Sequence, residues 1–438
     1  MSRLFYGWRI VGVAALAQTV SVGTTFYAYG VFVKPLIAEF DVSRLAVTMG
    51  LTLTMIVQGL IAPFLGRALD RHSPRTILVC GVLLEAVGML LLARAAAFWQ
   101  LGLLFVGAIG IGSYLFSPLA TSAVVGRWFD RQRGRALGIT ALGSAAGGIF
   151  APPLVTAAIA ALGWRGAAGA MGGVLLLLVA PIALVVVRQP EDLGLTPDGD
   201  ARAPRPRPIA DVSSAVATPA PTTAALLRQR NFWAITIAIG LTYSPVSVLL
   251  AHLVPYGTDL GLEPARAAIV MSGFGFGAAA GRLPFGWLAD RVDRRIAVWI
   301  MLGWMALAFW SLLGEPAFPR LLAAATAVGF AVGGTIPLWG ALAGAAFGRH
   351  AIGSAMGLMN LLMLPFSISG APLAAWVFDR TGSYAIAFAS FLACFPLGAV
   401  AIAFLRIDAR DPQGVSSDGA LDDTASSVRL EGADGGPG

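Results

Sequence analysis

Long apolar stretches alternate with short polar ones along nearly the whole chain. Each stretch comes close to the length of about 20 residues that an α-helix needs to cross the hydrocarbon core of a bilayer. The pattern separates into twelve such stretches and therefore predicts twelve membrane helices. They fall near residues 10–32, 45–65, 76–92, 98–125, 136–162 and 163–188, and then 232–256, 265–288, 296–314, 321–347, 352–377 and 384–405.

Two polar segments stand outside this pattern. Residues 189–230 mix seven prolines with Asp, Ser, Thr and Arg, which is typical of a flexible linker. Residues 407–438 are rich in Asp, Ser and Gly, and we expect them to form a disordered tail. The chain is therefore predicted to be all-α, with one six-helix bundle in residues 1–188 and a second in residues 231–406.

One charged turn occurs twice. The run from Gly66 to Arg75 and the run from Gly286 to Arg295 share a frame of Gly, Leu, Asp-Arg and a closing Arg. Each run lies between two apolar stretches, so both are predicted to be tight turns that keep their arginines in water. The repeat indicates that the second half of the chain duplicates the first.

Composition supports a polytopic membrane protein. Of the 438 residues 57% are hydrophobic and only 12% are charged, about half the charged share of soluble domains. A net charge of +7 would suggest nucleic acid as the partner of a soluble protein, but here the basic residues fall in short loops and indicate topology instead. They place the linker, both repeated turns and both termini in the cytoplasm, which fits the inner (plasma) membrane of a prokaryote.

Two six-helix halves with this doubled Gly…Asp-Arg…Arg turn resemble the major facilitator superfamily. Within it, Tyr6-Gly7-Trp8 and the run from Trp128 to Ser144 resemble the monocarboxylate transporters and their bacterial relatives, including the oxalate–formate antiporters. The resemblance implies the major facilitator fold, in which two bundles rock about a site near the midplane. It also implies a secondary transporter of lactate- or pyruvate-like anions, working by proton coupling or by exchange.

Arg282 is the leading candidate for a substrate ligand. It lies inside the eighth stretch, and Arg282 to Gly286 resembles the Arg-x-x-x-Gly of the monocarboxylate transporters, where the arginine meets the substrate carboxylate. A guanidinium keeps its charge and offers a planar fork that suits a carboxylate. The alternative is an arginine that extends to cytoplasmic water. The chain departs from the family pattern at Ala278, where several members have Asp, and at Tyr27, where some have Lys.

Further polar residues inside the predicted spans could also face a substrate, because hydrocarbon makes such groups costly. His252 suits a proton site or a carboxylate donor, with a polar anchor at the helix end as the alternative. The neutral candidates, each of which could equally serve in packing, are Tyr27, Tyr114, Ser117, Tyr243 and Asn360. Gly143 and Gly147 have the GxxxG spacing that brings helix backbones together.

A second set of residues is predicted to control conformation. Charge pairs at a cytoplasmic turn can hold two helices in one state and release them in the other. The candidates for this coupling or gating role are Asp70, Arg71, Asp290, Arg291, Arg131 and Glu85. The alternative for the charged residues of the turns is that they lie in solvated loops and have no gating role. Glu85 is the one carboxylate deep in a predicted span, and its alternatives are a structural partner role or a carboxylate at a helix end.

Other classes of function receive less support from the sequence. The same fold could carry a drug, a sugar or an amino acid, or serve as a transporter-like membrane sensor. An enzyme is not expected, because the H-E-x-x-H, G-x-S-x-G and phosphate-loop motifs are missing and the three histidines lie far apart. We expect no cofactor or metal, and as partners a small organic anion, protons and the lipid bilayer, in a monomer or weak dimer.

Overall fold

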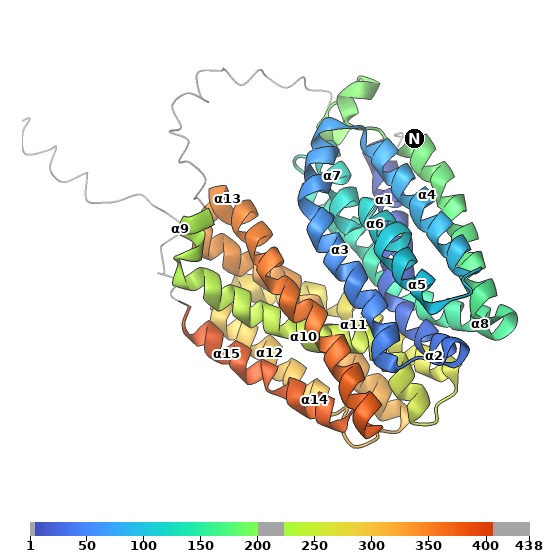
Figure 1. The fold of residues 1–438 in the computed structure, drawn as a ribbon. Coiled ribbons are helices and arrows are strands. Elements are labelled where there is room, and N and C mark those ends of the chain that lie inside the picture. Colours follow the sequence, from blue (N-terminus) through green and yellow to red (C-terminus); the bar gives the residue numbers. More distant parts are fainter. Residues whose placement is uncertain (1–4, 200–222, 406–438) are drawn as a thin grey trace, which may run out of the picture. The chain divides into compact units, whose positions relative to one another are not determined.

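The computed structural model describes residues 5–199 and 223–405, and every regular element in these ranges is a helix (Figure 1). The predicted tail and residues 200–222 of the predicted linker lie outside the described residues. Side chains are likewise not described for Pro63, Asp70 and residues 348–354.

The first half carries the helices that correspond to the first six apolar stretches. Two of its spans contain a π-helical turn, named η1 and η2, which lies between α-helical pieces. In chain order the elements are α1 (Gly7–Val22), η1 (Gly23–Tyr27), α2 (Tyr29–Phe40), α3 (Arg44–Arg71), α4 (Pro74–Leu92), α5 (Phe98–Leu104), η2 (Phe105–Ile109), α6 (Gly110–Leu115), α7 (Pro118–Trp128) and α8 (Arg133–Val185).

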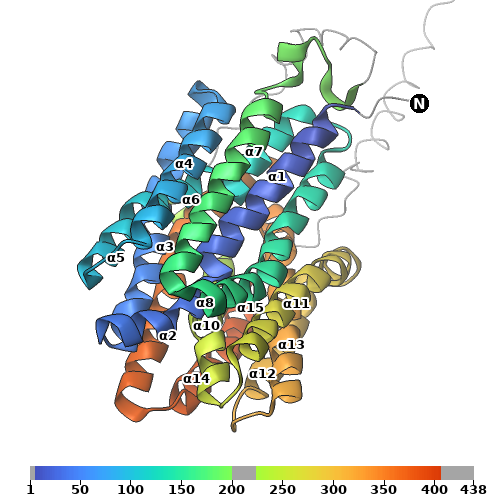
Figure 2. The ribbon, with the colours of Figure 1, turned by 90° about the vertical axis from the view of Figure 1, so that its right-hand side faces the viewer.

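The second half repeats this plan. Short turns η3 (Pro190–Leu193) and η4 (Pro197–Gly199) precede it, and α9 (Thr223–Leu227) leads into it. Its longer elements are α10 (Arg230–Asp259), α11 (Pro264–Arg291), α12 (Arg294–Trp310), α13 (Phe318–Thr381), α14 (Ala385–Leu392) and α15 (Cys394–Ala403). The halves meet where α8 packs on α11, α3 on α13 and α2 on α10, as the two ribbon views show (Figures 1 and 2).

Nine helices in the described ranges are long and apolar enough to cross a membrane. The twelve predicted stretches map onto them once two differences are explained. Helix α8 carries two stretches, because Gly163 at φ 69° turns the chain between them. Helix α11 is interrupted by polar residues and α12 has only 17 residues, so neither belongs to the nine.

The two repeated turns have the same local structure. Helices α3 and α11 both have 28 residues and both end at the arginine of the Asp-Arg pair. In each case the next helix begins after two residues. Helix α4 has Pro74 in its first turn. At the start of α12 the Asp293 carboxylate accepts a hydrogen bond from the Arg295 amide at 2.7 Å. Pro and Asp both favour helix starts, so the turns follow from their sequences.

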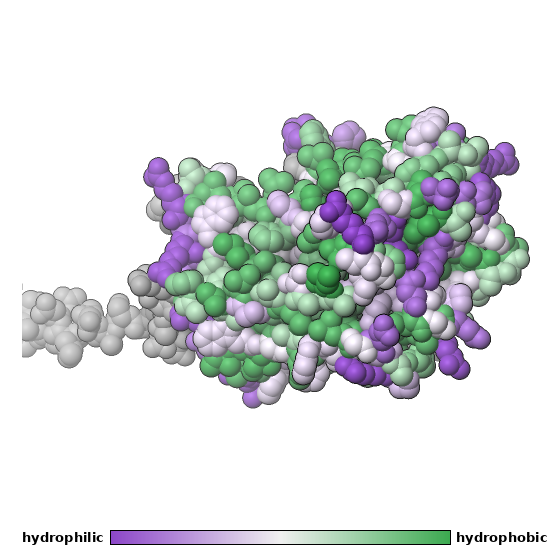
Figure 3. Space-filling view, turned by 60° about the horizontal axis from the view of Figure 1, so that its bottom comes forward, coloured by the Kyte–Doolittle hydropathy of each residue, from purple (hydrophilic) through white to green (hydrophobic). Residues whose placement is uncertain are grey.

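Hydrophobic side chains cover much of the outer surface, as one face shows in Figure 3. Leu177, Leu184 and Leu283 are exposed by 75%, 78% and 83%. Such exposure fits contact with lipid and not with water. Between helices the packing uses small residues: a Cβ on Gly147 would lie 2.5 Å from the Thr19 carbonyl oxygen, and Gly143 lies equally tight against Ala15. The close approach predicted from the GxxxG spacing is confirmed.

The first part of the predicted linker contains the short turns η3 and η4 and contacts the first bundle. The Asp198 carboxylate accepts hydrogen bonds from the amides of Asp130, Arg131 and Gln132 at 3.1, 2.7 and 3.2 Å. Burial alone would raise the pKa of Asp198, but these amides and the charge of Arg131 lower it overall. The segment that ends at η4 is therefore tied to the turn that precedes α8.

Candidate functional site

A central cavity of about 810 Å³ lies between the two halves. Its lining combines an apolar wall with a few polar side chains, which is the composition of a small-ligand site. The first half contributes Gln18, Val22, Phe26, Tyr27, Met55, Pro118, Ser122, Ala141 and Ser144, and the second half contributes Tyr243, Val246, Ser247, Leu250, Phe274, Arg282, Val332, Ile336, Pro337, Asn360 and Ser367.

Arg282 is the single charged residue in this lining. Its Nη1 donates a hydrogen bond of 2.6 Å to the carbonyl oxygen of Ala141, which belongs to α8 of the other half. Among the described residues no carboxylate pairs with Arg282. A guanidinium has five N–H donors, so most of its capacity is available to a ligand in the cavity.

Three of the neutral candidates join Arg282 in the lining: Tyr27, Tyr243 and Asn360. Tyr27 ends the π-helical turn η1, and its ring lies 6.3 Å from that of Phe274, measured between centroids. Next to Tyr27, helices α8 and α11 approach each other closely. A Cβ added to Gly148 of α8 would lie 2.7 Å from Cζ of Tyr27 and 3.1 Å from Cα of Gly275 in α11. The glycines thus let α8 and α11 approach each other closely beside Tyr27 of η1, and Tyr27 and Arg282 of α11 face the same cavity.

The other three candidates lie outside the lining. Ser117 is buried beside the lining residue Pro118, and its hydroxyl has no partner within the described residues. Tyr114 lies in α6, away from the cavity. His252 is fully buried, and both ring nitrogens are engaged, Nε2 with the Ala371 carbonyl at 2.9 Å and Nδ1 with the Tyr384 hydroxyl at 3.0 Å.

Sequence reasoning missed a polar pair in the cavity wall. The Ser144 hydroxyl donates to Oε1 of Gln18 at 2.8 Å, and Nε2 of Gln18 donates to the Thr121 hydroxyl at 3.0 Å. Both Gln18 and Ser144 line the cavity. Gln18 could have been singled out from the sequence, because an amide side chain in the middle of a membrane span is costly unless it has a role.

A polar cluster joins the two halves at the end opposite the repeated turns, and we call it the outer cluster. It consists of Lys34 and Arg44 from the first half and Asp259, Asp379 and Tyr384 from the second. Asp259 pairs with Lys34 and with Arg44, each at 2.7 Å. Nη1 of Arg44 also donates to the Tyr384 hydroxyl at 2.6 Å.

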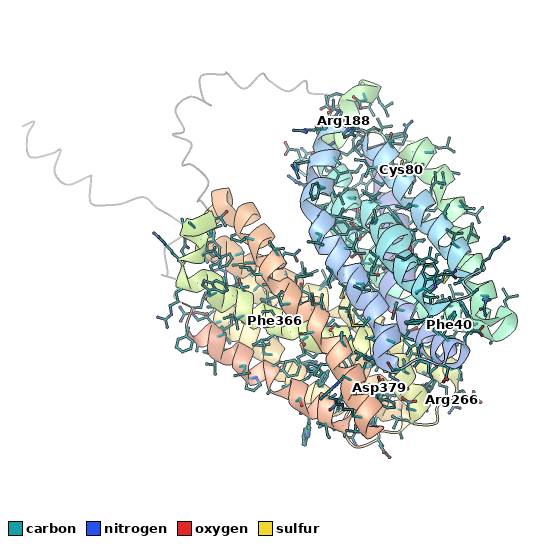
Figure 4. All side chains as sticks on the ribbon, viewed as in Figure 1. Phe40, Cys80, Arg188, Arg266, Phe366 and Asp379 are labelled. Carbon is teal, nitrogen blue, oxygen red and sulfur yellow. The ribbon has the colours of Figure 1, made fainter. Side chains whose placement is uncertain are left out.

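Two further contacts strengthen the outer cluster. The Asp379 carboxylate accepts from the amides of Arg44 and Leu45 at 3.1 and 2.9 Å, which caps α3 from the other half. The Arg44 guanidinium lies 3.8 Å from the centroid of the Phe378 ring. Figure 4 shows Asp379 at the far end of the molecule from Arg188. The cluster therefore closes this end by contacts between the halves.

The predicted gating residues lie at the end where the repeated turns are. Asp290 and Arg291 are exposed, with the Arg291 guanidinium 5.2 Å from the Trp287 ring centroid. Arg71 and Arg131 are also exposed, and the Asp70 side chain is not described. Glu85 differs from all of these, since it is fully buried in α4.

Comparisons with known proteins agree with this arrangement. The sequence profile of the Major Facilitator Superfamily matches residues 15–263 and 235–430. Bovine (Bos taurus) monocarboxylate transporter 13 is 28% identical over 388 residues, covering 87% of this chain and 85% of its own. Human (Homo sapiens) monocarboxylate transporter 11 is 29% identical over 395 residues, covering 87% of this chain and 79% of its own. The similarity to the superfamily and to monocarboxylate transporters that the sequence motifs predicted is confirmed.

Solved structures share the fold at lower identity. A bacterial homologue of the human lysosomal transporter Spinster, in an inward-facing and unoccupied conformation, has a TM-score of 0.67 at 15% identity. The match covers 92% of this chain and 95% of that chain. Its inward-facing, occupied form has a TM-score of 0.68 at 16% identity. The predicted fold of two six-helix bundles is confirmed.

Proposed function

Because the chain belongs to the major facilitator superfamily, we propose that it is a secondary transporter that moves small monocarboxylates, such as lactate, pyruvate or related organic anions, by alternating access. Transport is coupled to protons or proceeds by exchange. The relatives named as monocarboxylate transporters support this substrate class.

The observation that carries the proposal is the position of Arg282. It is half-buried in the wall of the central cavity, whose lining contains no carboxylate among the described residues. A desolvated guanidinium needs an anion, which a bound substrate would supply. The hydrogen bond that Arg282 donates to a carbonyl of the other half can be exchanged for one to a substrate oxygen.

The remaining lining supports a small substrate with an apolar side. Tyr27, Tyr243 and Asn360 offer neutral donors, whereas residues such as Val332 and Phe274 form an apolar wall. One charge and several neutral groups suit a single carboxylate with a short carbon chain. Among the described residues the lining offers no second cation for a dicarboxylate.

In alternating access, one end of the molecule is closed while the other end is open. In this structure the outer cluster joins the halves at one end. The repeated turns lie at the other end, which we assign to the cytoplasm of a plasma membrane together with both termini. Asp70, Arg71, Asp290, Arg291 and Arg131 then bias the conformations without touching the substrate. Residues 1–188 and 231–406 are the two moving bundles.

Small carboxylates are expected to stabilise the purified protein, because a ligand of the folded state raises its melting temperature by mass action. The measurement is a thermal unfolding series with lactate, pyruvate and acetate at rising concentration. The matched controls are the amides of the same acids, which keep the size and lose the charge. Equal stabilisation by amides and acids would contradict an anion site.

A further inference from the structure

Glu85 lies where a membrane protein can least easily hold a charge. Its side chain is fully buried in α4, and Oε1 contacts the hydroxyls of Thr24 and Thr25 at 2.8 and 3.4 Å. Oε2 is also buried and has no hydrogen-bond partner within the described residues. A buried carboxylate with no cation beside it is costly in hydrocarbon, so this position demands a physical reason.

Hydrogen-bond counting favours a proton on Glu85. The Thr24 hydroxyl has one proton but two oxygens at 2.8 Å, Oε1 of Glu85 and the carbonyl of Val20. An ionised Glu85 leaves one of these contacts without a hydrogen atom. A protonated Glu85 donates from Oε1 to the Thr24 hydroxyl, which then donates to Val20, and both contacts become hydrogen bonds. The two distances therefore fit the neutral acid better than the ionised one.

No other charge compensates Glu85. Among the described residues none of the elements packed against α4 supplies it with an ion pair or a further hydrogen bond. The titratable or charged groups on α4 and on these neighbouring elements are Arg75, Cys80, Tyr27, Arg44, Arg67, Asp70, Arg71, Tyr114, Arg127, Arg133, Arg135 and Arg165. The side chain of Asp70 is not described. A proton would neutralise Glu85 without requiring any further side chain.

The partners of Glu85 belong to the element that shapes the substrate cavity. Thr24 and Thr25 lie in η1, the π-helical turn that ends at Tyr27. A π-helical turn inside an α-helix is uncommon and frequently marks a functional position. Because Glu85 holds this turn through Thr24, a change in its proton occupancy changes the support of Tyr27, which faces the same cavity as Arg282.

We propose that Glu85 binds the proton that this transporter moves with its substrate, and that its occupancy is conveyed to the cavity through η1 and Tyr27. The inference rests on the proposed function, which it extends by assigning the coupling ion and its site. In the step itself an O–H bond forms at Oε1 with a proton taken from water on one side. The same bond breaks when the proton is returned to water on the other side.

The test compares two modes of transport in proteoliposomes that contain the full chain. One is accumulation of labelled lactate, pyruvate or acetate driven by an inward proton gradient. The other is exchange of the labelled acid for the same unlabelled acid inside, without a gradient. In Glu85→Gln, which imitates the protonated state, gradient-driven accumulation should be lost and exchange should remain. The control is Glu39→Gln, since Glu39 is partly exposed and pairs with Arg165 at 2.6 Å. It should keep both modes.

Several outcomes would overturn the inference. One is a gradient-driven accumulation by Glu85→Gln at the wild-type level. Another is wild-type accumulation that an inward proton gradient does not drive, which needs no variant at all. If Glu85→Gln does not insert into the membrane, Glu85→Asp replaces it in the test. This variant keeps the acid but moves the carboxyl group away from Thr24. An exchange rate with the same pH dependence as in wild type would then contradict the inference. Failure of the proposed function differs, because then wild type would neither bind nor exchange any of these acids.

Discussion

Carboxylate binding is expected to be lost in Arg282→Ala. If the substrate carboxylate accepts hydrogen bonds from this guanidinium, truncating a buried charge-assisted pair costs about 2–5 kcal/mol. That corresponds to a loss of affinity of roughly 30-fold or more. The thermal stabilisation by lactate, pyruvate or acetate should therefore disappear, and it can be measured on the purified variant alongside wild type.

The matched control lies on the same helix. Arg266 is also an arginine of α11, but it is exposed near the end of the helix, where Figure 4 places it, and its guanidinium lies 5.7 Å from the Phe318 ring centroid. Arg266→Ala should keep the stabilisation by acids. Equal stabilisation of both variants would show that the cavity arginine does not meet the anion.

The second large effect is expected at the outer cluster. Arg44 is 7% exposed and connects the halves through Asp259 and Tyr384. In the proposed alternating-access cycle these contacts form when this end closes, so we expect Arg44→Ala to destabilise the closed state relative to the open one. A loss of about 2 kcal/mol, the low end for a paired and mostly buried charge, shifts the conformational equilibrium by roughly 30-fold.

Cysteine labelling measures this shift. Cys80 and Cys394 are first replaced, and a single cysteine is then introduced at Leu250 in the cavity wall. In vesicles, a membrane-impermeant maleimide added from the outer side should label Arg44→Ala faster than the unsubstituted background. Arg165→Ala is the control, because its pair with Glu39 stays within one half and is about 40% exposed, and such pairs contribute little. Equal labelling rates in all three would refute the role of the outer cluster.

Local chemistry explains what could be predicted from the sequence. The spans follow from hydropathy, and the turns from Gly, Pro and Asp at positions that need them, so the twelve stretches and the doubled turn have counterparts in the helices. Arg282 could be singled out because a permanent charge within an apolar stretch has few uses. Gly143 and Gly147 marked a close helix contact for a similar reason: only small side chains fit there.

The rest depends on contacts between residues far apart in the chain. Arg44 and Asp259 each stood in a short loop, where isolated charges indicate topology, and their pairing appears only when α3 and α10 are placed together. The same holds for His252, whose partners Tyr384 and Ala371 come from later elements and draw it away from the cavity.

The linker contains one contact that its composition does not indicate. Its prolines and polar residues predicted a flexible linker, and residues 200–222 of it lie outside the described residues. Asp198 contacts the first bundle, because its carboxylate accepts hydrogen bonds from three backbone amides that precede α8. Such capping by a distant acid cannot be recognised from the linker sequence alone.

Uptake of labelled lactate, pyruvate and acetate into proteoliposomes by Arg282→Lys tests the central claim most directly. Lysine keeps the charge but loses the planar, two-pronged donor, so we expect severely reduced uptake at matched insertion, while wild type takes up at least one acid and none of the amides. A lysine that merely extends toward water would serve as well as arginine. Uptake by Arg282→Lys at the wild-type rate would contradict the assignment of Arg282 as the carboxylate ligand.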